Sequence, residues 1–315
     1  MTQSPKKITI VGAGMWGRAL GKLANKNHHL IKLWTRHSDE SLAEAIAGAE
    51  IMISAVAMKG LESTIAQLQN LTIPDDVIIV TATKGLDPRT LDTPSHLWQQ
   101  AFPHQAIVVL SGPNLSKEIE QGLPAATVVA SQDLKAAQII QEIFASETFR
   151  VYVNEDPLGT ELGGTLKNVM AIASGVCAGL NLGTNAQAAL LTRALPEMIR
   201  VGVHLGADPE TFVGLSGLGD LLATCSSPLS RNYQVGYKIA KGKTLEEILA
   251  ESEGTAEGVN TTNVLIQLAQ KEHISVPICY QVYQLLNGKK TPEEAVKSLM
   301  ARELKPEFPH QPFSY

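Results

Sequence analysis

Seven short runs of β-branched and other apolar residues fall within the first half of the chain. They cover residues 8–11, 30–34, 51–56, 77–81, 107–110, 126–130 and 149–153. Helical stretches lie between them, for example residues 15–25, 61–69 and 134–145. Continuous apolar runs are typical of strands that are buried on both faces, and their alternation with helices favours parallel pairing. The pattern predicts an α/β fold whose N-terminal half is a doubly wound, mostly parallel sheet.

The pattern changes after Val153, where strand-like runs give way to long helical ones. The second half begins with an apolar stripe at helical spacing, formed by Leu162, Leu166, Val169, Met170, Ala173, Val176, Cys177 and Leu180. Further helices are predicted over residues 197–205, 245–250, 262–272 and 292–302. We therefore expect two domains, a sheet domain over residues 1–153 and a C-terminal all-helical domain over residues 154–315.

Composition and charge exclude several classes of protein. The chain has 315 residues and a formal net charge of -5, which argues against a nucleic-acid or membrane-surface partner. Any phosphate site must therefore be a local cluster of positive charge. No apolar run approaches the roughly 18 residues that a membrane span needs. The three cysteines are far apart and the eight histidines show no metal-ligand spacing, so we expect no disulfide, no metal and a cytoplasmic protein.

A glycine-rich turn directly follows the first predicted strand and leads into a helix. It reads Gly12-Ala13-Gly14-Met15-Trp16-Gly17. In dinucleotide-binding proteins the first glycine permits a tight turn, the second lets the backbone approach a pyrophosphate, and the third packs helix against strand. Glycine pairs also make ordinary turns, but the strand–turn–helix context favours a Rossmann-like dinucleotide-binding domain. We expect Gly12, Gly14, Met15, Trp16 and Gly17 to contact the cofactor.

The end of the second predicted strand indicates which cofactor is bound. NAD enzymes usually place Asp or Glu there, whereas this chain reads Leu33-Trp34-Thr35-Arg36-His37-Ser38. The guanidinium of Arg36 can pair with the 2′-phosphate of NADP, and a solvated surface arginine is the alternative interpretation. We expect NADP(H) as the cofactor, with NAD(H) as a second one.

Two lysines are candidates for chemistry. Lys84 follows a predicted strand, where α/β sheets bind ligands, although taken alone a surface lysine is the simpler interpretation. Lys167 lies beside the apolar stripe of its helix, with Gly163 and Gly164 as neighbours on the same face. Such a face would admit a cofactor ring, and a lysine in a crevice can act as an acid or base. A structural lysine is the alternative.

Two later segments offer further polar groups. Residues 214–220 are rich in glycine and end in Asp220, and Thr224 lies one turn later if Asp220 starts a helix. Ser230-Arg231-Asn232 offers hydroxyl, guanidinium and amide donors that suit a phosphate, although a charged capping turn is an equally good interpretation. Ser111-Gly112-Pro113-Asn114 follows another strand and is by itself only a turn.

Together these segments resemble bacterial NAD(P)-dependent glycerol-3-phosphate dehydrogenases over nearly the whole chain, from about Lys7 to about Arg302. The most specific segments are residues 164–175, 206–212 and 217–221, and residues 230–232 and 82–85 complete the set. The resemblance implies hydride transfer between glycerol 3-phosphate and dihydroxyacetone phosphate, which supplies phospholipid synthesis in the cytoplasm. A small phosphorylated substrate and a homodimer are the expected partners.

The resemblance also implies roles for particular positions. Lys167 would be the catalytic acid/base and would contact the substrate, and Lys84 would lie near both substrate and nicotinamide. The other implied substrate contacts are Gly112, Asn114, Asp220, Ser230, Arg231 and Asn232. The implied cofactor contacts outside the glycine turn are Arg36, Lys84, Ser116, Arg231 and Glu257.

Two features depart from the family's pattern. Only 14 residues separate Arg36 from Ile51, where the family usually has a longer insertion. The adenine-side walls of the cofactor site are therefore undefined by the resemblance. Asn114 stands where the family usually has Thr or Ser. Neither departure removes a group that the chemistry needs.

Two other functions remain open from the sequence. A dehydrogenase of β-hydroxy acids would need a carboxylate-binding site and would not respond to a phosphate on the substrate. A non-catalytic NADP(H)-binding regulator would keep the glycine turn without turnover. The combination of Lys84, Lys167, Asp220 and Arg231 speaks against the regulator.

Overall fold

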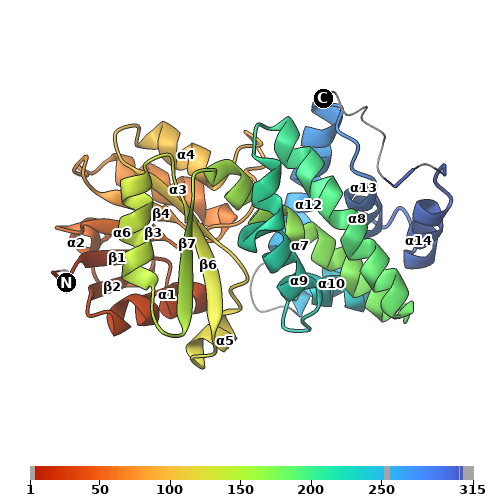
Figure 1. Cartoon of the computed structure of the whole chain (residues 1–315), viewed down its shortest axis with the longest axis horizontal. Coiled ribbons are helices and arrows are strands. Elements are labelled where there is room, and N and C mark those ends of the chain that lie inside the picture. The colour runs from red at the N-terminus through yellow and green to blue at the C-terminus, as the bar shows by residue number, and fades with distance from the viewer. Residues whose placement is uncertain (1–3, 252–255, 305, 308–315) are drawn as a thin grey trace, which may run out of the picture.

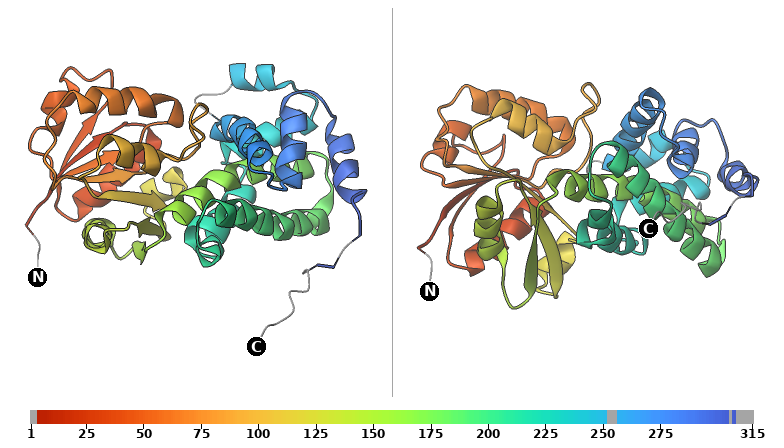
Figure 2. Two further views of the ribbon diagram at one scale, coloured as in Figure 1. Left: turned by 90° about the horizontal axis from the view of Figure 1, so that it is seen from above. Right: turned by 45° about the horizontal axis from the view of Figure 1, so that its top comes forward.

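The computed structural model describes residues 4–251, 256–304 and 306–307, and its two halves are built differently. The first half is a sheet with helices on both faces, and the second half is helical (Figure 1). The last strand, β7, ends at Asn154, and helix α7 begins at Pro157. Figure 2 shows from two further directions that the helical half lies to one side of the sheet. Helix α7 contacts β5 and β6 and so joins the two halves.

The described chain forms one sheet of seven strands in the order β2-β1-β3-β4-β5-β6-β7. The strands are β1 (Lys7–Val11), β2 (Leu30–Trp34), β3 (Ile51–Ser54), β4 (Ile78–Thr81), β5 (Ile107–Ser111), β6 (Ala125–Ala130) and β7 (Phe149–Asn154). All neighbours are parallel except β5 and β6. The strand order reverses between β1 and β3, and in such sheets ligands bind outside the carboxyl ends of the strands at this point.

Alternate strand residues pack into two separate helical layers. Ile8 and Ile10 of β1 join a core with α1 and α6, whereas Val11 joins a core with α3 and α4 on the opposite face. The helices of this half are α1 (Met15–Lys26), α2 (Leu42–Ile46), α3 (Met58–Gln69), α4 (Pro94–Ala101), α5 (Ser116–Glu120) and α6 (Leu134–Phe144). Because both faces of the central strands are buried, their sequences are apolar throughout rather than alternating.

Helix α7 forms the centre of the second half. The helices around it are α8 (Gly183–His204), η1 (Pro209–Val213), η2 (Leu215–Gly219), α9 (Asp220–Cys225), α10 (Arg231–Ala240), α11 (Leu245–Ala250), α12 (Glu257–Lys271), α13 (Pro277–Leu286) and α14 (Pro292–Met300). Helix α7 (Pro157–Gly179) packs backbone to backbone against α10. A Cβ on Gly175 would lie 2.0 Å from the carbonyl oxygen of Tyr233, and one on Gly236 would lie 1.9 Å from that of Ile172. Only glycine allows this approach.

The predicted fold class is confirmed. All seven predicted strands are present, with ends that differ by no more than two residues. Helices α10 and α13 were not predicted, and the prediction for α8 missed everything before residue 197. Residues 183–189 of α8 are exposed or half-buried and carry no apolar stripe, whereas Leu190, Leu191 and Leu195 pack against the core.

Candidate active site

The glycine turn lies where the strand order of the sheet reverses. Gly12 has a φ of +108°, and its N–H donates to the carbonyl oxygen of Trp34 in β2 at 2.8 Å. A Cβ on Gly12 would lie 2.7 Å from the carbonyl oxygen of Ala55, just beyond β3, and one on Gly17 would lie 1.9 Å from that of Gly12. The first and third glycines therefore permit the tight turn and the close helix packing that such motifs require.

The second glycine of the turn faces open space. No other atom lies within 4 Å of the position that a Cβ on Gly14 would take. Gly14 is also the N-cap of α1, where no side chain caps the helix and no acidic residue occupies the first turn. Met15, the first residue of the helix, is exposed. The free N–H groups and the positive end of the helix dipole therefore suit a pyrophosphate, and the residues present fit a dinucleotide.

Arg36 lies beside this turn, at the same carboxyl edge of the sheet. Strands β1 and β2 are parallel with Val11 opposite Trp34, so the chain beyond β2 emerges next to the glycine turn. The Arg36 side chain is exposed, and its Nε donates to His37 Nε2 at 3.3 Å. It forms no ion pair with any residue that the structure describes. Its guanidinium is therefore available to a phosphate.

A cluster of charged side chains, of which Lys167 and Asp220 are buried and Lys84 is half-buried, lies where α7 and α9 meet the same edge. Lys84, three residues beyond β4, places its Nζ 2.5 Å from Oδ2 of Asp220. Lys167 of α7 places its Nζ 3.0 Å from Oδ1 of Asp220 and donates to Thr224 Oγ1 at 2.6 Å. Thr224 in turn donates to Asp220 Oδ1 at 2.9 Å. One carboxylate therefore holds two ammonium groups from different parts of the chain.

Thr224 was noted from the sequence only for its spacing from Asp220. Because Asp220 is the first residue of α9, the two side chains lie on one face of that helix, four residues apart. The structure makes Thr224 a direct partner of Lys167 as well.

Burial and charge together set the proton affinities of this cluster. The side chain of Lys167 is 9% exposed, and the loss of water lowers its pKa although Asp220 opposes that shift. The Lys84 charge lowers the pKa of Lys167 further. Burial alone would raise the pKa of Asp220, but Lys167 and Lys84 outweigh it and hold that pKa below its ordinary value. A lysine with a lowered pKa beside an ionised carboxylate is suited to proton exchange.

The face of α7 that carries Gly163 and Gly164 packs against the protein itself, whereas the sequence suggested that it would admit a cofactor ring. A Cβ on Gly163 would lie 2.8 Å from the carbonyl oxygen of Ser216, and one on Gly164 would lie 2.3 Å from Ser111 Oγ and 3.5 Å from Lys84 Nζ. The protein's own chain therefore occupies the space predicted for a cofactor ring. These glycines let β5, η2 and Lys84 approach α7 closely.

The segment at residues 230–232 is the start of a helix. Ser230 caps α10 by accepting a hydrogen bond from the backbone N–H of Tyr233, so the capping interpretation is confirmed for its hydroxyl oxygen. Asn232 is buried, and its Oδ1 accepts from the N–H of Gly258 in α12 at 3.0 Å. Arg231 is exposed at the first position of α10. Among the described residues, no acceptor takes the hydroxyl proton of Ser230 or the amide NH₂ of Asn232 in a hydrogen bond, so both can donate to a ligand.

Glu257 lies close to this helix start, as the first residue of α12. It is half-buried, which raises the pKa of its carboxyl group, while the charges of Arg231, Lys84 and Lys167 oppose that rise. The structure therefore brings Glu257, Arg231 and the lysine cluster into one electrostatic environment.

The loop after β5 is built around the neighbouring strand. Gly112 has a φ of +154°, and a Cβ there would lie 3.0 Å from Cα of Thr127. Asn114 accepts a hydrogen bond from Thr127 Oγ1 at 2.8 Å and donates to the carbonyl oxygen of Ala126 at 3.3 Å. Ser116 is half-buried at the start of α5. The polar atoms of Asn114 are thus used within the fold, and its predicted substrate contact stays a prediction.

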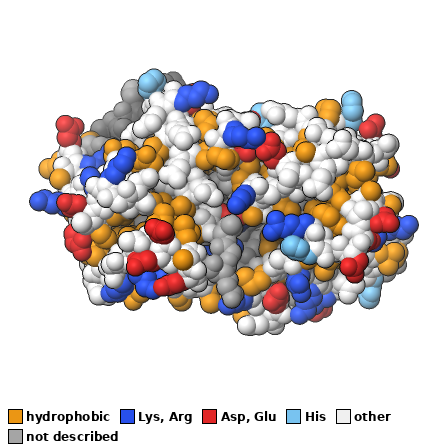
Figure 3. Space-filling view, turned by 180° about the vertical axis from the view of Figure 1, so that it is seen from behind, with side chains coloured by type: hydrophobic (Ala, Val, Ile, Leu, Met, Phe, Trp, Pro, Cys, Tyr) orange, Lys and Arg blue, Asp and Glu red, His pale blue; other side chains and the backbone are white. Residues whose placement is uncertain are grey.

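Positive charge does not dominate the surface, in keeping with the formal net charge of -5. Figure 3 shows on one face that Lys and Arg side chains are interspersed with Asp and Glu. Among the described residues, no group of three or more His, Cys, Asp or Glu side chains could hold a metal ion, and no helix is long and apolar enough to cross a membrane. All three cysteines are buried and free.

The fold and the site define a class of protein, in which a dinucleotide-binding sheet meets a helical unit that carries a buried, ion-paired lysine. The chain belongs to the NAD-dependent glycerol-3-phosphate dehydrogenase family. Residues 156–297 match the model of the family's C-terminus, and residues 7–41 and 37–137 match that of its N-terminus. The two N-terminal stretches meet at residues 37–41, within the segment that is shorter than the family's pattern.

Individual relatives agree with this assignment and confirm the resemblance. A glycerol-3-phosphate dehydrogenase (NAD(P)+) of Acaryochloris marina is 63% identical over 304 residues, 96% of this chain and 98% of that protein. A crystal structure of glycerol-3-phosphate dehydrogenase from Coxiella burnetii has a TM-score of 0.90 at 31% identity, and the match covers 95% of this chain and 99% of the other. The enzyme of Saccharomyces cerevisiae has a TM-score of 0.81 at 23% identity over 93% and 99% of the two chains, and supports the fold alone.

Proposed function

We propose that this chain interconverts sn-glycerol 3-phosphate and dihydroxyacetone phosphate by hydride transfer with NADP(H) or NAD(H). The observation that carries the proposal is the ion-paired Lys84–Asp220–Lys167 cluster, which lies at the same carboxyl edge of the sheet as the uncapped glycine turn. The relatives that bear this enzyme's name match the chain over nearly its full length. Residues 1–153 bind the dinucleotide, and residues 154–315 provide the acid/base and most substrate contacts.

Lys167 acts as the acid/base. The nicotinamide, when bound, supplies or accepts the hydride. Reduction of a carbonyl leaves charge on its oxygen, so a proton donor must face that atom. The Nζ of Lys167 donates this proton, and in the reverse reaction its neutral form accepts one from the hydroxyl, which a lowered pKa favours. Asp220 and Thr224 fix the direction of the Lys167 ammonium group. Lys84, which pairs with the other oxygen of the Asp220 carboxylate, binds the substrate oxygen.

Arg231 holds the phosphate of the substrate. Its planar guanidinium can engage two phosphate oxygens at once, and Ser230 and Asn232 supply the remaining donors of the site. The binding energy of the phosphate then positions the carbonyl beside Lys167, although the phosphate takes no part in the chemical step. Gly112 and Asn114 complete the substrate site.

Arg36 gives the site a preference for NADP(H) by pairing with the 2′-phosphate. Met15 and Trp16 contact the cofactor at the start of α1, and Ser116 and Glu257 contact it from the other walls of the crevice. The enzyme works in the cytoplasm as a homodimer and supplies glycerol 3-phosphate to phospholipid synthesis.

The test is NADPH oxidation by the purified protein with dihydroxyacetone phosphate, compared with unphosphorylated dihydroxyacetone. We expect turnover with the phosphorylated substrate at a much higher kcat/KM, because only that substrate engages Arg231. Equal kcat/KM values would instead indicate a dehydrogenase that ignores phosphate. Cofactor binding without turnover on either substrate would indicate a regulator.

A further inference from the structure

The segment that carries Lys84 is attached to helix α7 at two points on one helical face. Near Lys84, the backbone N–H of Gly85 donates to Thr165 Oγ1 at 3.0 Å. At the far end, the backbone N–H of Ser95 donates to Glu161 Oε1 at 2.9 Å, and its hydroxyl donates to Oε2 of the same carboxylate. Glu161 and Thr165 are four residues apart, so both attachments lie on one side of α7. Helix α7 is also the helix that carries Lys167.

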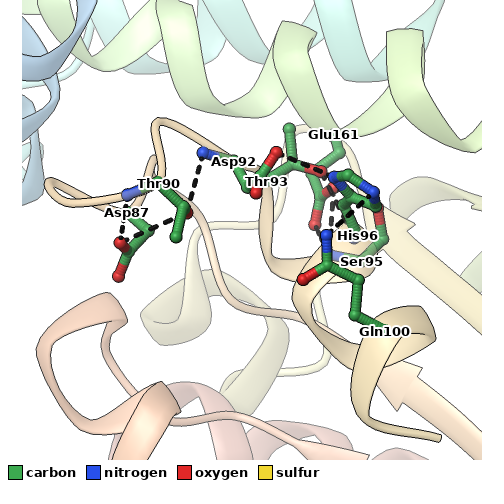
Figure 4. A network of polar contacts seen from close by, with 8 residues as sticks. All are labelled: Asp87, Thr90, Asp92, Thr93, Ser95, His96, Gln100 and Glu161. Atoms are coloured by element: carbon green, nitrogen blue, oxygen red, sulfur yellow. Dashed lines mark hydrogen bonds and ion pairs between the residues drawn. The ribbon is translucent and has the colours of Figure 1, made fainter.

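The segment between the two attachments is held together by its own hydrogen bonds. Asp87 Oδ1 accepts from the N–H groups of Arg89 and Thr90, both at 2.9 Å, and the N–H of Asp87 donates to the carbonyl oxygen of Asp92 at 2.9 Å. Figure 4 shows this turn leading from Asp87 through Thr93 to Ser95 and Glu161. These hydrogen bonds link residues 87–92 to one another between the two attachments.

The segment also packs against the protein at its near end, where Leu86 is buried in the core around α7. Nearer its far end it borders a cavity of about 650 Å³, which Leu91, Thr93 and Ser95 line together with Pro157 and Leu158 at the start of α7. Beside this cavity, the hydrogen bonds to Glu161 join the segment to α7.

Glu161 makes its attachment from a buried position. Glu161 is only 2% exposed, and this burial raises the pKa of its carboxyl group to about 7. A group with this pKa is partly neutral at neutral pH. The hydrogen bonds between Ser95 and Glu161 must therefore also form when the Glu161 carboxyl group is protonated.

We propose that Glu161 is a positioning residue, which fixes the far end of the Lys84 segment on α7 and so sets the separation of Lys84 and Lys167 across Asp220. The inference rests on the proposed function, since it takes both lysines as groups of the reaction site. Glu161 itself touches neither lysine in any hydrogen bond or ion pair of the described residues. Its effect is transmitted along residues 84–95.

Steady-state kinetics of Glu161→Leu and Glu161→Gln test the proposal. Leucine removes both acceptors, so we expect kcat for dihydroxyacetone phosphate to fall about tenfold to a hundredfold, the scale of a misplaced reacting group. The KM for NADPH should change less than kcat does, because no hydrogen bond or ion pair between described residues joins Glu161 to the glycine turn. Glutamine should restore kcat, because its carbonyl oxygen accepts from Ser95 N–H and its NH₂ can donate to the neighbouring hydroxyls.

Glu197→Leu is the matched control. Glu197 is also 2% exposed and also accepts hydrogen bonds at a helix start, in its case from the N–H groups of Ile278 at 3.0 Å and Cys279 at 2.9 Å in α13. No hydrogen bond or ion pair between described residues links it to the Lys84 segment. We expect its loss to lower the melting temperature about as much as Glu161→Leu does, while kcat per folded molecule stays at the wild-type value.

Equal kcat values in Glu161→Leu and wild type would overturn the proposal, as would equal losses in the Glu161 and Glu197 variants or a failure of glutamine to restore activity. If Glu161→Leu does not fold, Ser95→Ala weakens the same attachment, because it removes the hydroxyl hydrogen bond and leaves the N–H bond in place. We then expect a smaller fall in kcat, and a kcat equal to that of the wild type would contradict the proposal. Wild-type protein that shows no turnover of dihydroxyacetone phosphate would refute the proposed function instead.

Discussion

Asp220 is the residue on which the geometry of the reaction site depends. Its carboxylate pairs with Lys84 through one oxygen and with Lys167 through the other. All three side chains are removed from water to a large extent, and an unpaired charge in such a place is costly. Substitution of Asp220 should therefore disturb both lysines at once, whereas loss of either lysine leaves the other pair intact.

Asp220→Asn should change the pH dependence of the reaction as well as its rate. The Asp220 carboxylate raises the pKa of Lys167 against the lowering effect of burial, so its removal leaves that pKa lower still. Reduction of dihydroxyacetone phosphate needs protonated Lys167 and is lost as pH rises through the pKa. We expect the alkaline limb of the kcat–pH profile to move to lower pH in Asp220→Asn. An alkaline limb that stays in place would show that Lys167 is not the group that titrates.

Sequence reasoning at the residue scale found the two lysines and Asp220 but not how they meet. Lys84 and Asp220 are 136 residues apart, and no local pattern records that one carboxylate holds both lysines. Glu161 gave no signal, because it reads as an ordinary polar residue at the start of a helix. The small-residue face of α7 was noticed, but its use by the protein's own backbone depends on tertiary packing.

Helix starts and strand ends provide most of the predicted binding groups. The start of α1 was predictable because glycine spacing after an apolar run has a direct backbone meaning. The start of α10 was not, because Ser230 and Asn232 allow both a phosphate site and a capping turn. The structure shows the cap and leaves Arg231 exposed beside it.

Arg36 tests the cofactor preference at the end of β2. Arg36→Ala should weaken NADPH binding by roughly 1.5–3 kcal/mol, about ten- to a hundredfold, because a charge-assisted hydrogen bond to the 2′-phosphate is lost. NADH has no such phosphate and should bind almost as before. Dissociation constants for both cofactors, measured by fluorescence titration, check this expectation. An equal loss for NADPH and NADH would rule out the 2′-phosphate contact.

Arg231 tests the phosphate contact at the start of α10. In Arg231→Ala the advantage of dihydroxyacetone phosphate over dihydroxyacetone in kcat/KM should shrink sharply. Both KM and kcat should suffer, because the phosphate also aligns the carbonyl. Arg231→Lys keeps the charge but loses the two-pronged geometry, so it should be impaired too. An unchanged ratio between the two substrates would place the phosphate elsewhere, with Lys84 as the next candidate.

At the scale of the whole molecule, the different functions proposed for the two halves follow from their sequences. Continuous apolar runs and a glycine turn specify a sheet that binds a dinucleotide at its carboxyl edge. An all-helical half then has to bring its polar groups to that edge, and α7 does so by packing its glycines against β5 and η2. The central strands were predictable because they are buried on both faces, whereas β2 is largely exposed and β7 alternates between buried and exposed residues. Helix α13 was missed although Ile278, Cys279, Val282, Leu285 and Leu286 form an apolar stripe at helical spacing.

The central claim is that Lys167 is the acid/base of a site assembled between the two halves. Lys167→Ala tests it most directly, with kcat for NADPH-dependent reduction of dihydroxyacetone phosphate measured beside NADPH affinity and melting temperature. The account predicts a loss of roughly 10²–10⁴-fold in kcat, the usual contribution of a positioned acid or base, with folding and NADPH binding retained. Near-normal turnover in a folded Lys167→Ala protein would contradict the account.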